Sequence, residues 1–229
     1  MRKLLRALLG ITVPIALCLG VIYVAIPRPA EVESAAGLGD ATELEGGAGT
    51  TLVGSPDGTW TATEGWVGYR VIEDYARLSD TVEGYGRTEA VSAGMVIDNL
   101  TVTSLQATAD LTRLRSERDL RDRAIRVRYL ETDTHPEAAF GLTEPVPLDP
   151  LPQPGVVTDF TVAGELELRG ITRGVTVELQ ARWDGDDIHV VGSAPVRLSA
   201  FDIERPDIAA YVEVSDDAIF EFELTFTRD

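Results

Sequence analysis

The chain has 229 residues, 44% of them hydrophobic, and a formal net charge of −18. An acidic surface repels phosphates and gains nothing from releasing their counterions, so the charge excludes nucleic acid as an expected partner. The single cysteine, Cys18, lies in the hydrophobic N-terminal run, which excludes disulfides and cysteine zinc sites from the remainder. That remainder, about 170 residues of globular sequence, fits one domain.

A membrane anchor is predicted at the N-terminus. Arg2, Lys3 and Arg6 precede an uncharged stretch of 20 residues at positions 7–26. At about 1.5 Å per residue, such a helix spans a hydrocarbon core of roughly 30 Å, and a basic flank stays in the cytoplasm. Residues 1–28 are therefore expected to form a cytoplasmic basic flank and a transmembrane signal-anchor in the cell membrane, with the folded part extracytoplasmic.

Two alternatives would remove this anchor. A cleaved signal peptide has an apolar core of ~7–15 residues and a small-residue cleavage site, whereas this run is longer and ends in Ile26, Pro27 and Arg28. A lipoprotein modified at Cys18 would carry a small residue before the cysteine, where Leu17 stands. We therefore expect the N-terminal helix to stay uncleaved.

A linker is predicted at residues 29–58. This segment is rich in Gly, Ala, Glu, Ser and Thr and contains no aromatic residue. It cannot bury enough apolar surface to offset the entropy of ordering its backbone. We expect a flexible tether between the membrane and the folded domain.

From residue 59 onward the hydrophobic pattern has a period of two. Residues 220–226, FEFELTF, alternate strictly between apolar and polar, and similar alternation occurs at residues 67–71, 160–168 and 175–179. Strands with one dry and one wet face are typical of antiparallel sheets. Many such strands either pair two sheets or close into a barrel, and the pattern alone does not choose. Residues 59–229 are predicted to form one mainly β domain.

Two segments depart from this period. In residues 116–130 the apolar residues recur at helical spacing, and Ser116 is a favourable N-cap, so a helix is predicted there. Its expected apolar face consists of Leu120, Ala124, Val127 and Leu130. A stretch with five prolines at residues 145–154 is predicted to be a loop or an edge connection.

The search for catalytic motifs finds little. The two histidines, His135 beside a proline and His189 in an expected strand, do not form a metal-ligand pattern, so no metal or other cofactor is expected. There is no Gly-x-Ser-x-Gly elbow or phosphate loop, and nothing places a serine on a strained turn. The many carboxylates are explained by outward-facing strand positions more simply than by paired-acid hydrolysis. The sequence therefore favours a protein that is not an enzyme.

A cluster of arginines stands out in this acidic chain. Seven fall within sixteen residues: Arg113, Arg115, Arg118, Arg121, Arg123, Arg126 and Arg128. One interpretation is a helix with ion pairs such as Asp122 with Arg126, each worth only ~0.3–0.5 kcal/mol. The other is a basic patch at a pocket mouth, where a guanidinium grips a phosphate or carboxylate head group.

Several motifs carry a resemblance that runs through the whole expected domain. In chain order they are residues 68–71 (GYRV), 86–88 (GRT) with Val91, 121–122 (RD), 129–132 (YLET), 135–140 (HPEAAF) and 164–172 (GELELRGIT). With these the region from Trp60 to the C-terminus resembles the YceI-like family of lipid-binding domains, in the form of its membrane-anchored actinobacterial members. The anchor and linker lie outside the resemblance.

The resemblance implies an extended, lipocalin-like antiparallel barrel of about eight strands with one helix. It implies a long apolar ligand in the lumen, such as a polyisoprenoid or a fatty-acid derivative, and it carries over no catalytic residue. Early in the first strand, where the family often has histidine or serine, this chain has Trp66 and Gly68. An inward Trp66 would shorten the lumen.

The candidate ligand-binding residues come from the inward apolar set and from the arginine cluster. They are Tyr69, Val71, Met95, Leu105, Arg121, Phe140, Leu166 and Phe222, with Arg121 as the head-group residue. A lumen of about eight strands holds either side chains or one slim ligand. A solid-core interaction module and, less favoured, a lipid-modifying enzyme therefore remain as alternatives. The sequence leaves the lipid, the direction of any transfer and the oligomeric state open.

Overall fold

The computed structural model describes residues 44, 54–75, 81–149, 152–205, 207–208 and 212–229. The predicted anchor at residues 1–28 and most of the predicted linker at residues 29–58 lie outside this described part. Among the described residues, no helix combines the length and the apolar character that crossing a bilayer requires.

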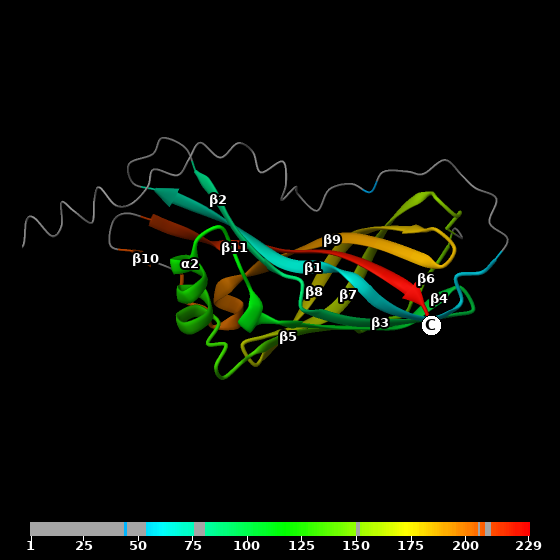
Figure 1. Ribbon diagram of the computed structural model, residues 1–229, viewed down its shortest axis with the longest axis horizontal. Coiled ribbons are helices and arrows are strands. Elements are labelled where there is room, and N and C mark those ends of the chain that lie inside the picture. Colours follow the sequence, from blue (N-terminus) through cyan, green and yellow to red (C-terminus); the bar gives the residue numbers. More distant parts are fainter. Residues whose placement is uncertain (1–43, 45–53, 76–80, 150–151, 206, 209–211) are drawn as a thin grey trace, which may run out of the picture. The chain divides into compact units, whose positions relative to one another are not determined.

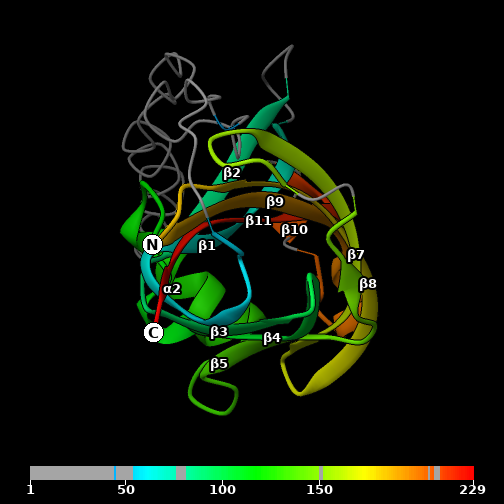
Figure 2. The same ribbon diagram turned by 90° about the vertical axis from the view of Figure 1, so that its right-hand side faces the viewer.

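The domain is a closed antiparallel barrel (Figures 1 and 2). Eight strands pair in a circuit that returns to its start: β1 (Gly58–Tyr75), β3 (Val91–Asp98), β4 (Thr101–Asp110), β5 (Glu137–Leu142), β7 (Val157–Leu168), β8 (Ile171–Trp183), β9 (Asp187–Arg197) and β11 (Val212–Arg228). Three short strands lie off this circuit: β2 (Val82–Thr88) beside β1, β6 (Val146–Pro147) beside β4, and β10 (Asp207–Ile208) beside β11. The predicted mainly β barrel of about eight strands is confirmed.

The pairing of β1 with β11 closes the barrel. These two strands are the longest, and their register shifts between Ala62 and Glu64 and again between Val71 and Glu73. Such bulges bend long strands, which lets a sheet curl round on itself. Gly65 lies at the first bulge with φ of 133°, where a Cβ would stand 2.1 Å from the Glu223 carbonyl oxygen. A side chain there would push the closing strands apart.

The alternation predicted from the sequence decides which side chains face inward. On β11, Phe222, Leu224 and Phe226 belong to the core clusters, whereas Glu223 lies outside. Trp66 also lies on the outer face, where its indole N–H donates to Glu223 and the Arg87 guanidinium stacks 5.5 Å from its ring. The inward position beside it belongs to Val67, so Trp66 does not shorten the lumen.

The helical segment is shorter than predicted. Helix α2 (Asp119–Ala124) is followed by a π-helical turn, η2 (Ile125–Tyr129). Ser116 is not its N-cap; instead the backbone N–H and hydroxyl of Ser116 donate to the Asp122 carboxylate, at 2.8 and 2.5 Å. The predicted apolar face is also wrong, because Leu120 is 85% exposed and Val127 is 61% exposed. The face that meets the barrel carries Asp122 and Arg121, and only Leu130 of the expected face is buried.

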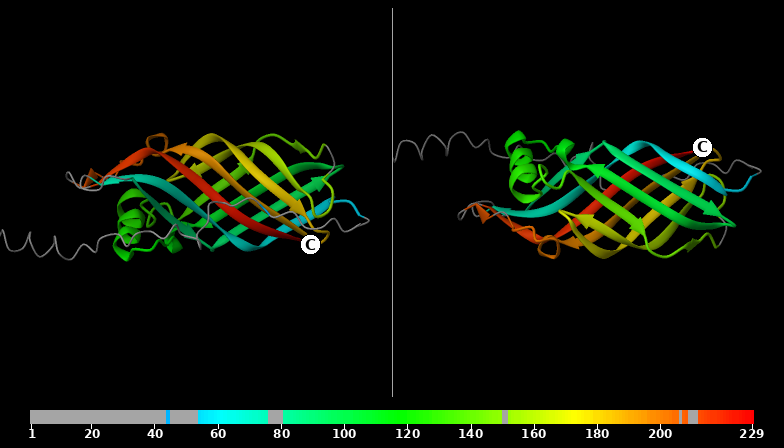
Figure 3. Two further views of the ribbon diagram at one scale, coloured as in Figure 1. Left: turned by 90° about the horizontal axis from the view of Figure 1, so that it is seen from above. Right: turned by 90° about the horizontal axis from the view of Figure 1, so that it is seen from below.

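The two ends of the barrel differ (Figure 3). Helix α2 lies at one end, and the C-terminus lies at the other. A core cluster closes the α2 end together with the 3₁₀ turns η1 (Leu111–Arg113) and η3 (Leu198–Phe201); its buried members are Leu111, Leu114, Leu130, Ala138, Leu166, Phe201 and Ile203. The predicted loop at residues 145–154 contains the two-residue strand β6 and no other regular element among its described residues.

Candidate ligand-binding lumen

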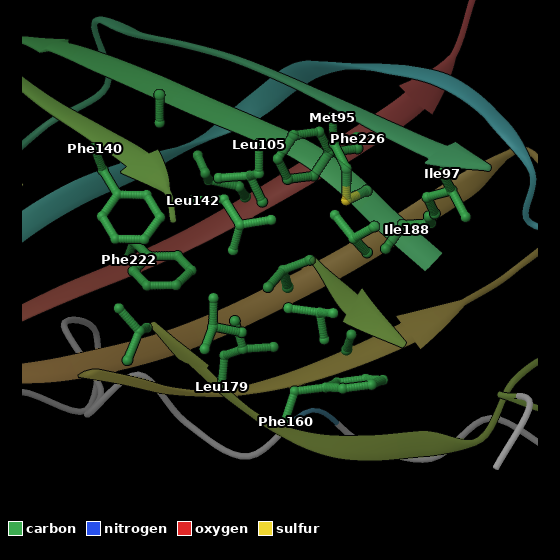
Figure 4. Close-up of a pocket in the computed structure, with 18 of the residues that line it drawn as sticks. Met95, Ile97, Leu105, Phe140, Leu142, Phe160, Leu179, Ile188, Phe222 and Phe226 are labelled. Carbon is green, nitrogen blue, oxygen red and sulfur yellow. The ribbon is translucent and has the colours of Figure 1, made fainter. Parts of the chain in front are cut away.

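The barrel encloses an apolar cavity that offers about 130 Å³ to the centre of a water-sized sphere. Side chains from β1, β3, β4, β5, β7, β8, β9 and β11 converge on it (Figure 4). The cavity is lined by Pro56, Val67, Met95, Ile97, Val102, Leu105, Ala107, Phe140, Leu142, Val146, Leu148, Pro152, Phe160, Val162, Val177, Leu179, Ala181, Trp183, Ile188, Val190, Phe220, Phe222, Leu224 and Phe226. All of these residues are apolar, so the lumen offers dispersion contacts and the hydrophobic effect to a guest.

The exposure of the inward residues shows that the lumen is not filled by its own side chains. Five side chains face inward yet are only partly buried: Leu105, Phe140, Phe160, Leu179 and Phe222. In a close-packed interior such side chains would lose their remaining exposure to neighbours. An apolar cavity of about 150 Å³ in a protein stays dry and binds a benzene-sized molecule. The observed space thus accommodates a slender apolar group, and a longer chain requires the phenyl rings to rotate.

Two inward-facing glycines let phenyl rings lie flat against the wall. A Cβ at Gly164 would stand 2.2 Å from the Phe140 ring, and a Cβ at Gly192 would stand 2.6 Å from the ring of Phe222. The second would also stand 2.7 Å from the Cβ of Leu179. Each ring therefore occupies space that a side chain would otherwise take on the neighbouring strand, and the axis of the barrel stays open.

Two tryptophans lie in the core cluster at the end away from α2, where Trp183 lines the cavity and Trp60 is fully buried. The indole N–H of Trp60 donates to the Pro56 carbonyl oxygen at 2.9 Å, and that of Trp183 donates to the Gly185 carbonyl oxygen at 2.7 Å. The Arg228 guanidinium stacks 4.5 Å from the Trp60 ring. Because both N–H groups are satisfied by backbone, the rings contribute apolar surface without an unpaired donor.

The residues predicted as ligand contacts divide into two groups. Met95, Leu105, Phe140 and Phe222 line the cavity. Tyr69 and Val71 lie beyond it, in a packed cluster with Val214 and Ala218 towards the α2 end, and Leu166 packs in the cluster around Phe201. The alternation identifies the inward face correctly for all of them, but it does not give their height along the barrel axis.

Arg121 holds α2 to the barrel. Its guanidinium forms an ion pair with Glu73 at 2.7 Å, with side-chain exposures of 17% and 9%. The hydroxyl of Tyr75 donates to the same Glu73 oxygen, Oε2, at 2.7 Å, and Arg126 donates to the Leu114 carbonyl oxygen. Both arginines thus have partners within the fold, and the head-group contact predicted for Arg121 stays a prediction.

Tyr69 lies in a polar environment beneath α2. Its ring lies over Gly86 of β2, and the Glu73 carboxylate lies over Gly84 in the same strand. Burial raises the pKa of Tyr69, and the carboxylates of Glu73 and Asp122 raise it further, against the opposing effect of Arg121. Burial and the hydrogen bond to Glu117 raise the pKa of Tyr85 to about 12. Among the described residues, the Tyr69 hydroxyl and the Asp122 Oδ2 have no hydrogen-bond partner.

The two histidines lie apart from the lumen. His189 is on the outer face of β9, where Nδ1 lies 3.1 Å from the Thr225 hydroxyl and Nε2 lies 3.5 Å from Asp184. The ring of His135 lies over Gly170 in the turn between β7 and β8. Within the described part of the chain, no group of three or more His, Cys, Asp or Glu residues could hold a metal ion.

Several lining residues were not singled out from the sequence. Phe160, Leu179, Leu224 and Phe226 lie on strands whose sequences alternate clearly between apolar and polar residues. Their inward direction was available from the period of two. The alternation did not indicate an inward direction for three further lining residues. Trp183 ends β8, Ile188 lies at the start of β9, and Pro152 lies in the proline-rich connection.

The comparisons with known proteins agree with this architecture. Residues 69–226 match the family model of the YceI-like domain. No curated protein matches the chain.

Three solved structures share the fold. A polyisoprenoid binding domain from Saccharophagus degradans has 18% identity and a TM-score of 0.61, covering 74% of this chain and 98% of its own. BcnA from Burkholderia cenocepacia has 19% identity and a TM-score of 0.55, and the match covers 70% of this chain and 95% of BcnA. The YceI protein of Campylobacter jejuni has 15% identity and a TM-score of 0.52, and the match covers 63% of this chain and 84% of that protein. At these identities the likeness concerns the fold.

Proposed function

The chain belongs to the family of YceI-like domains, and from this membership and the geometry of the lumen we propose that it binds a long apolar ligand inside its barrel. The observation that carries the proposal is a cavity with an entirely apolar wall, bounded by inward side chains that are only partly buried. A filled core would leave neither feature.

The energy available from such a wall is sufficient for binding. Each methylene that leaves water contributes roughly 0.8 kcal/mol. About twenty methylenes therefore supply roughly 16 kcal/mol, which exceeds the roughly 4–15 kcal/mol that association costs, whereas about five supply only roughly 4 kcal/mol. A ligand with a long chain meets this requirement, whereas a short polar metabolite does not.

The ligand class follows from the same geometry. From Phe220 to Phe226 the inward positions of β11 cover six residue steps, or about 20 Å along the strand. A narrow lumen of this length suits a polyisoprenoid or a fatty-acid-like chain, and the Saccharophagus degradans relative is described as polyisoprenoid-binding. The barrel acts as a carrier and not as an enzyme.

The location of the carrier is part of the proposal. The basic flank and the apolar run of residues 1–28 support a signal-anchor in the cell membrane with the barrel outside the cytoplasm. The acidic composition, with 38 Asp and Glu residues against 20 Lys and Arg, suits a soluble extracytoplasmic domain.

Mass spectrometry of lipids extracted from the purified protein tests the proposal. The wild-type chain should yield about one apolar lipid per barrel, as a container with a single lumen requires. In Ala107→Phe, a phenyl ring enters the cavity from β4, and the lipid should be lost. Thr108→Phe places the same ring on the exposed face of the same strand and should retain it.

Two results would contradict the carrier function. One is a wild-type protein that carries no lipid and takes up none from vesicles, as expected of a solid interaction module. The other is equal lipid content in Ala107→Phe and Thr108→Phe, because the lipid would then lie outside the lumen.

A further inference from the structure

Helix α2 and turn η2 present an exposed surface that neither the lumen nor the packing of the fold uses. Leu120 is 85% exposed and Val127 is 61% exposed, the two highest values among the exposed large hydrophobic residues of the described chain. Leu120 lies on α2 and Val127 lies on the adjoining turn η2, and both side chains project into solvent. The opposite side of the segment carries Arg121 and Asp122, which face the barrel.

Unpaired positive charge accompanies these two side chains. Arg123 and Arg128 are exposed beside them, and neither forms an ion pair with a described carboxylate; the Arg128 guanidinium stacks 5.5 Å from the Tyr129 ring. The stretch from residue 113 to residue 128 holds seven arginines against three carboxylates, a net charge of +4 in a chain of −18. We name Leu120, Arg123, Val127 and Arg128 the α2 patch.

Apolar side chains flanked by guanidinium groups match the interface of an anionic bilayer. There the apolar side chains enter the boundary between head groups and acyl chains, while the arginines remain at the phosphates. A nucleic acid would attract the arginines but would leave the two apolar side chains in water. The bilayer is therefore the partner that accounts for both halves of the patch.

We propose that the α2 patch docks the barrel on a membrane surface that contains anionic lipids. Figure 1 places α2 at the end of the barrel away from the C-terminus, so docking turns this end towards the bilayer. The inference does not depend on the lumen, and it holds whether or not the barrel carries a lipid.

Docking through α2 is compatible with the predicted anchor. Of the predicted linker, the 25 residues from 29 to 53 would reach up to about 88 Å if extended, at ~3.5 Å per residue. The 18 residues of β1 extend over about 60 Å. A chain anchored through residues 1–28 is thus long enough for the α2 end of the barrel to meet the same membrane.

Fluorescence of the full-length chain tests the proposal. An environment-sensitive dye is attached at Ala124→Cys in a Cys18→Ser background, which leaves all four patch residues in place. The protein is reconstituted with vesicles of phosphatidylcholine alone or mixed with phosphatidylglycerol. The emission should shift to the blue on the anionic vesicles only, and added salt should reduce the shift, because the attraction is screened within a Debye length of about 10 Å.

Variants locate the contact. Arg123→Gln with Arg128→Gln should weaken docking about 25-fold, since each arginine near an anionic surface contributes about fivefold. Leu120→Ser should weaken it about tenfold through lost apolar burial. The matched controls Arg173→Gln and Val156→Ser remove an exposed charge and an exposed apolar side chain elsewhere, and docking should be unchanged.

Three outcomes would overturn the proposal. These are no shift on either vesicle, equal shifts on neutral and anionic vesicles, and equal losses in the patch and control variants. A shift that requires an added acidic protein would assign the patch to a protein partner instead. Circular dichroism of each variant checks that the barrel remains folded.

Discussion

At the scale of single residues, the arginine cluster separates into two groups with different tasks. Arg121 and Arg126 are engaged inside the fold, with Glu73 and with the Leu114 carbonyl oxygen. Arg123 and Arg128 face solvent. The sequence offered two alternatives, a helix with ion pairs such as Asp122 with Arg126 and a basic patch at a pocket mouth. The predicted pair does not form, because Asp122 accepts from Ser116, and the ion pair that does form joins Arg121 to Glu73 of β1. Spacing alone could not divide them, because the division depends on where α2 meets β1.

Tyr69 provides a pH-dependent prediction. Burial raises its pKa above the ordinary value of 10.0, so the folded state holds the phenol proton more tightly than the unfolded chain does. The stabilisation linked to this proton is complete below pH 10 and is lost as the pH rises above it. In Tyr69→Phe, the free energy of unfolding should therefore fall less steeply above pH 10 than in the wild type.

The same substitution removes a buried hydroxyl that has no described partner. The free energy of unfolding at pH 7 should stay equal or rise by about 1 kcal/mol, since no hydrogen bond is lost. Urea titrations over the pH range measure both effects. Tyr85→Phe is the control at pH 7 alone, where it loses its hydrogen bond to Glu117, because the pKa of Tyr85 is itself raised. A loss of stability at pH 7 would show that the Tyr69 hydroxyl is hydrogen-bonded or hydrated, and an unchanged alkaline slope would show that folding does not raise its pKa.

At the scale of secondary-structure elements, glycines in the strands shape the lumen. Gly192→Ala on β9 places a Cβ 2.6 Å from the Phe222 ring and 2.7 Å from Leu179, so the ring must move towards the axis. We expect a loss of stability of about 1–3 kcal/mol from overpacking and weaker binding of an apolar probe. Thermal unfolding and titration with a fluorescent fatty acid measure the two effects.

Gly174→Ala on β8 is the matched control, because an added Cβ there meets nothing within 4 Å. It should leave probe binding unchanged and should not reduce stability, since alanine restricts the unfolded chain more than glycine does. Equal binding by both variants would mean that the Phe222 ring does not limit the lumen.

The helix shows where prediction from the sequence was limited. Leu120, Ala124, Val127 and Leu130 fit an apolar helical face, yet only Leu130 is buried. The contact with the barrel is dominated by the Arg121–Glu73 ion pair and by Asp122, which binds Ser116. A π-helical turn at Ile125–Tyr129 further changes the spacing. Periodicity assumes that the buried side is apolar and that the turn is regular, and neither condition holds here.

At the scale of the whole molecule, most of the fold could be predicted. The period of two gave the strands and their inward faces, and the family motifs gave the number of strands. The alternation could not show that the sheet closes into a barrel, because the strands of a sandwich alternate in the same way. The alternation also does not show how far along the barrel axis each inward residue lies. It therefore could not distinguish Met95 and Phe222, which line the cavity, from Val71 and Leu166, which pack beyond it.

The carrier function requires a ligand chain inside the lumen, and tryptophan quenching by a brominated fatty acid detects such a chain. Trp183 lines the cavity, whereas Trp66 lies on the outer face, so the measurement uses Trp66→Phe protein. We expect saturable quenching at one fatty acid per chain, and we expect it to be lost when Ala107→Phe fills the cavity. Quenching that never saturates, or that persists unchanged in the filled barrel, would contradict it.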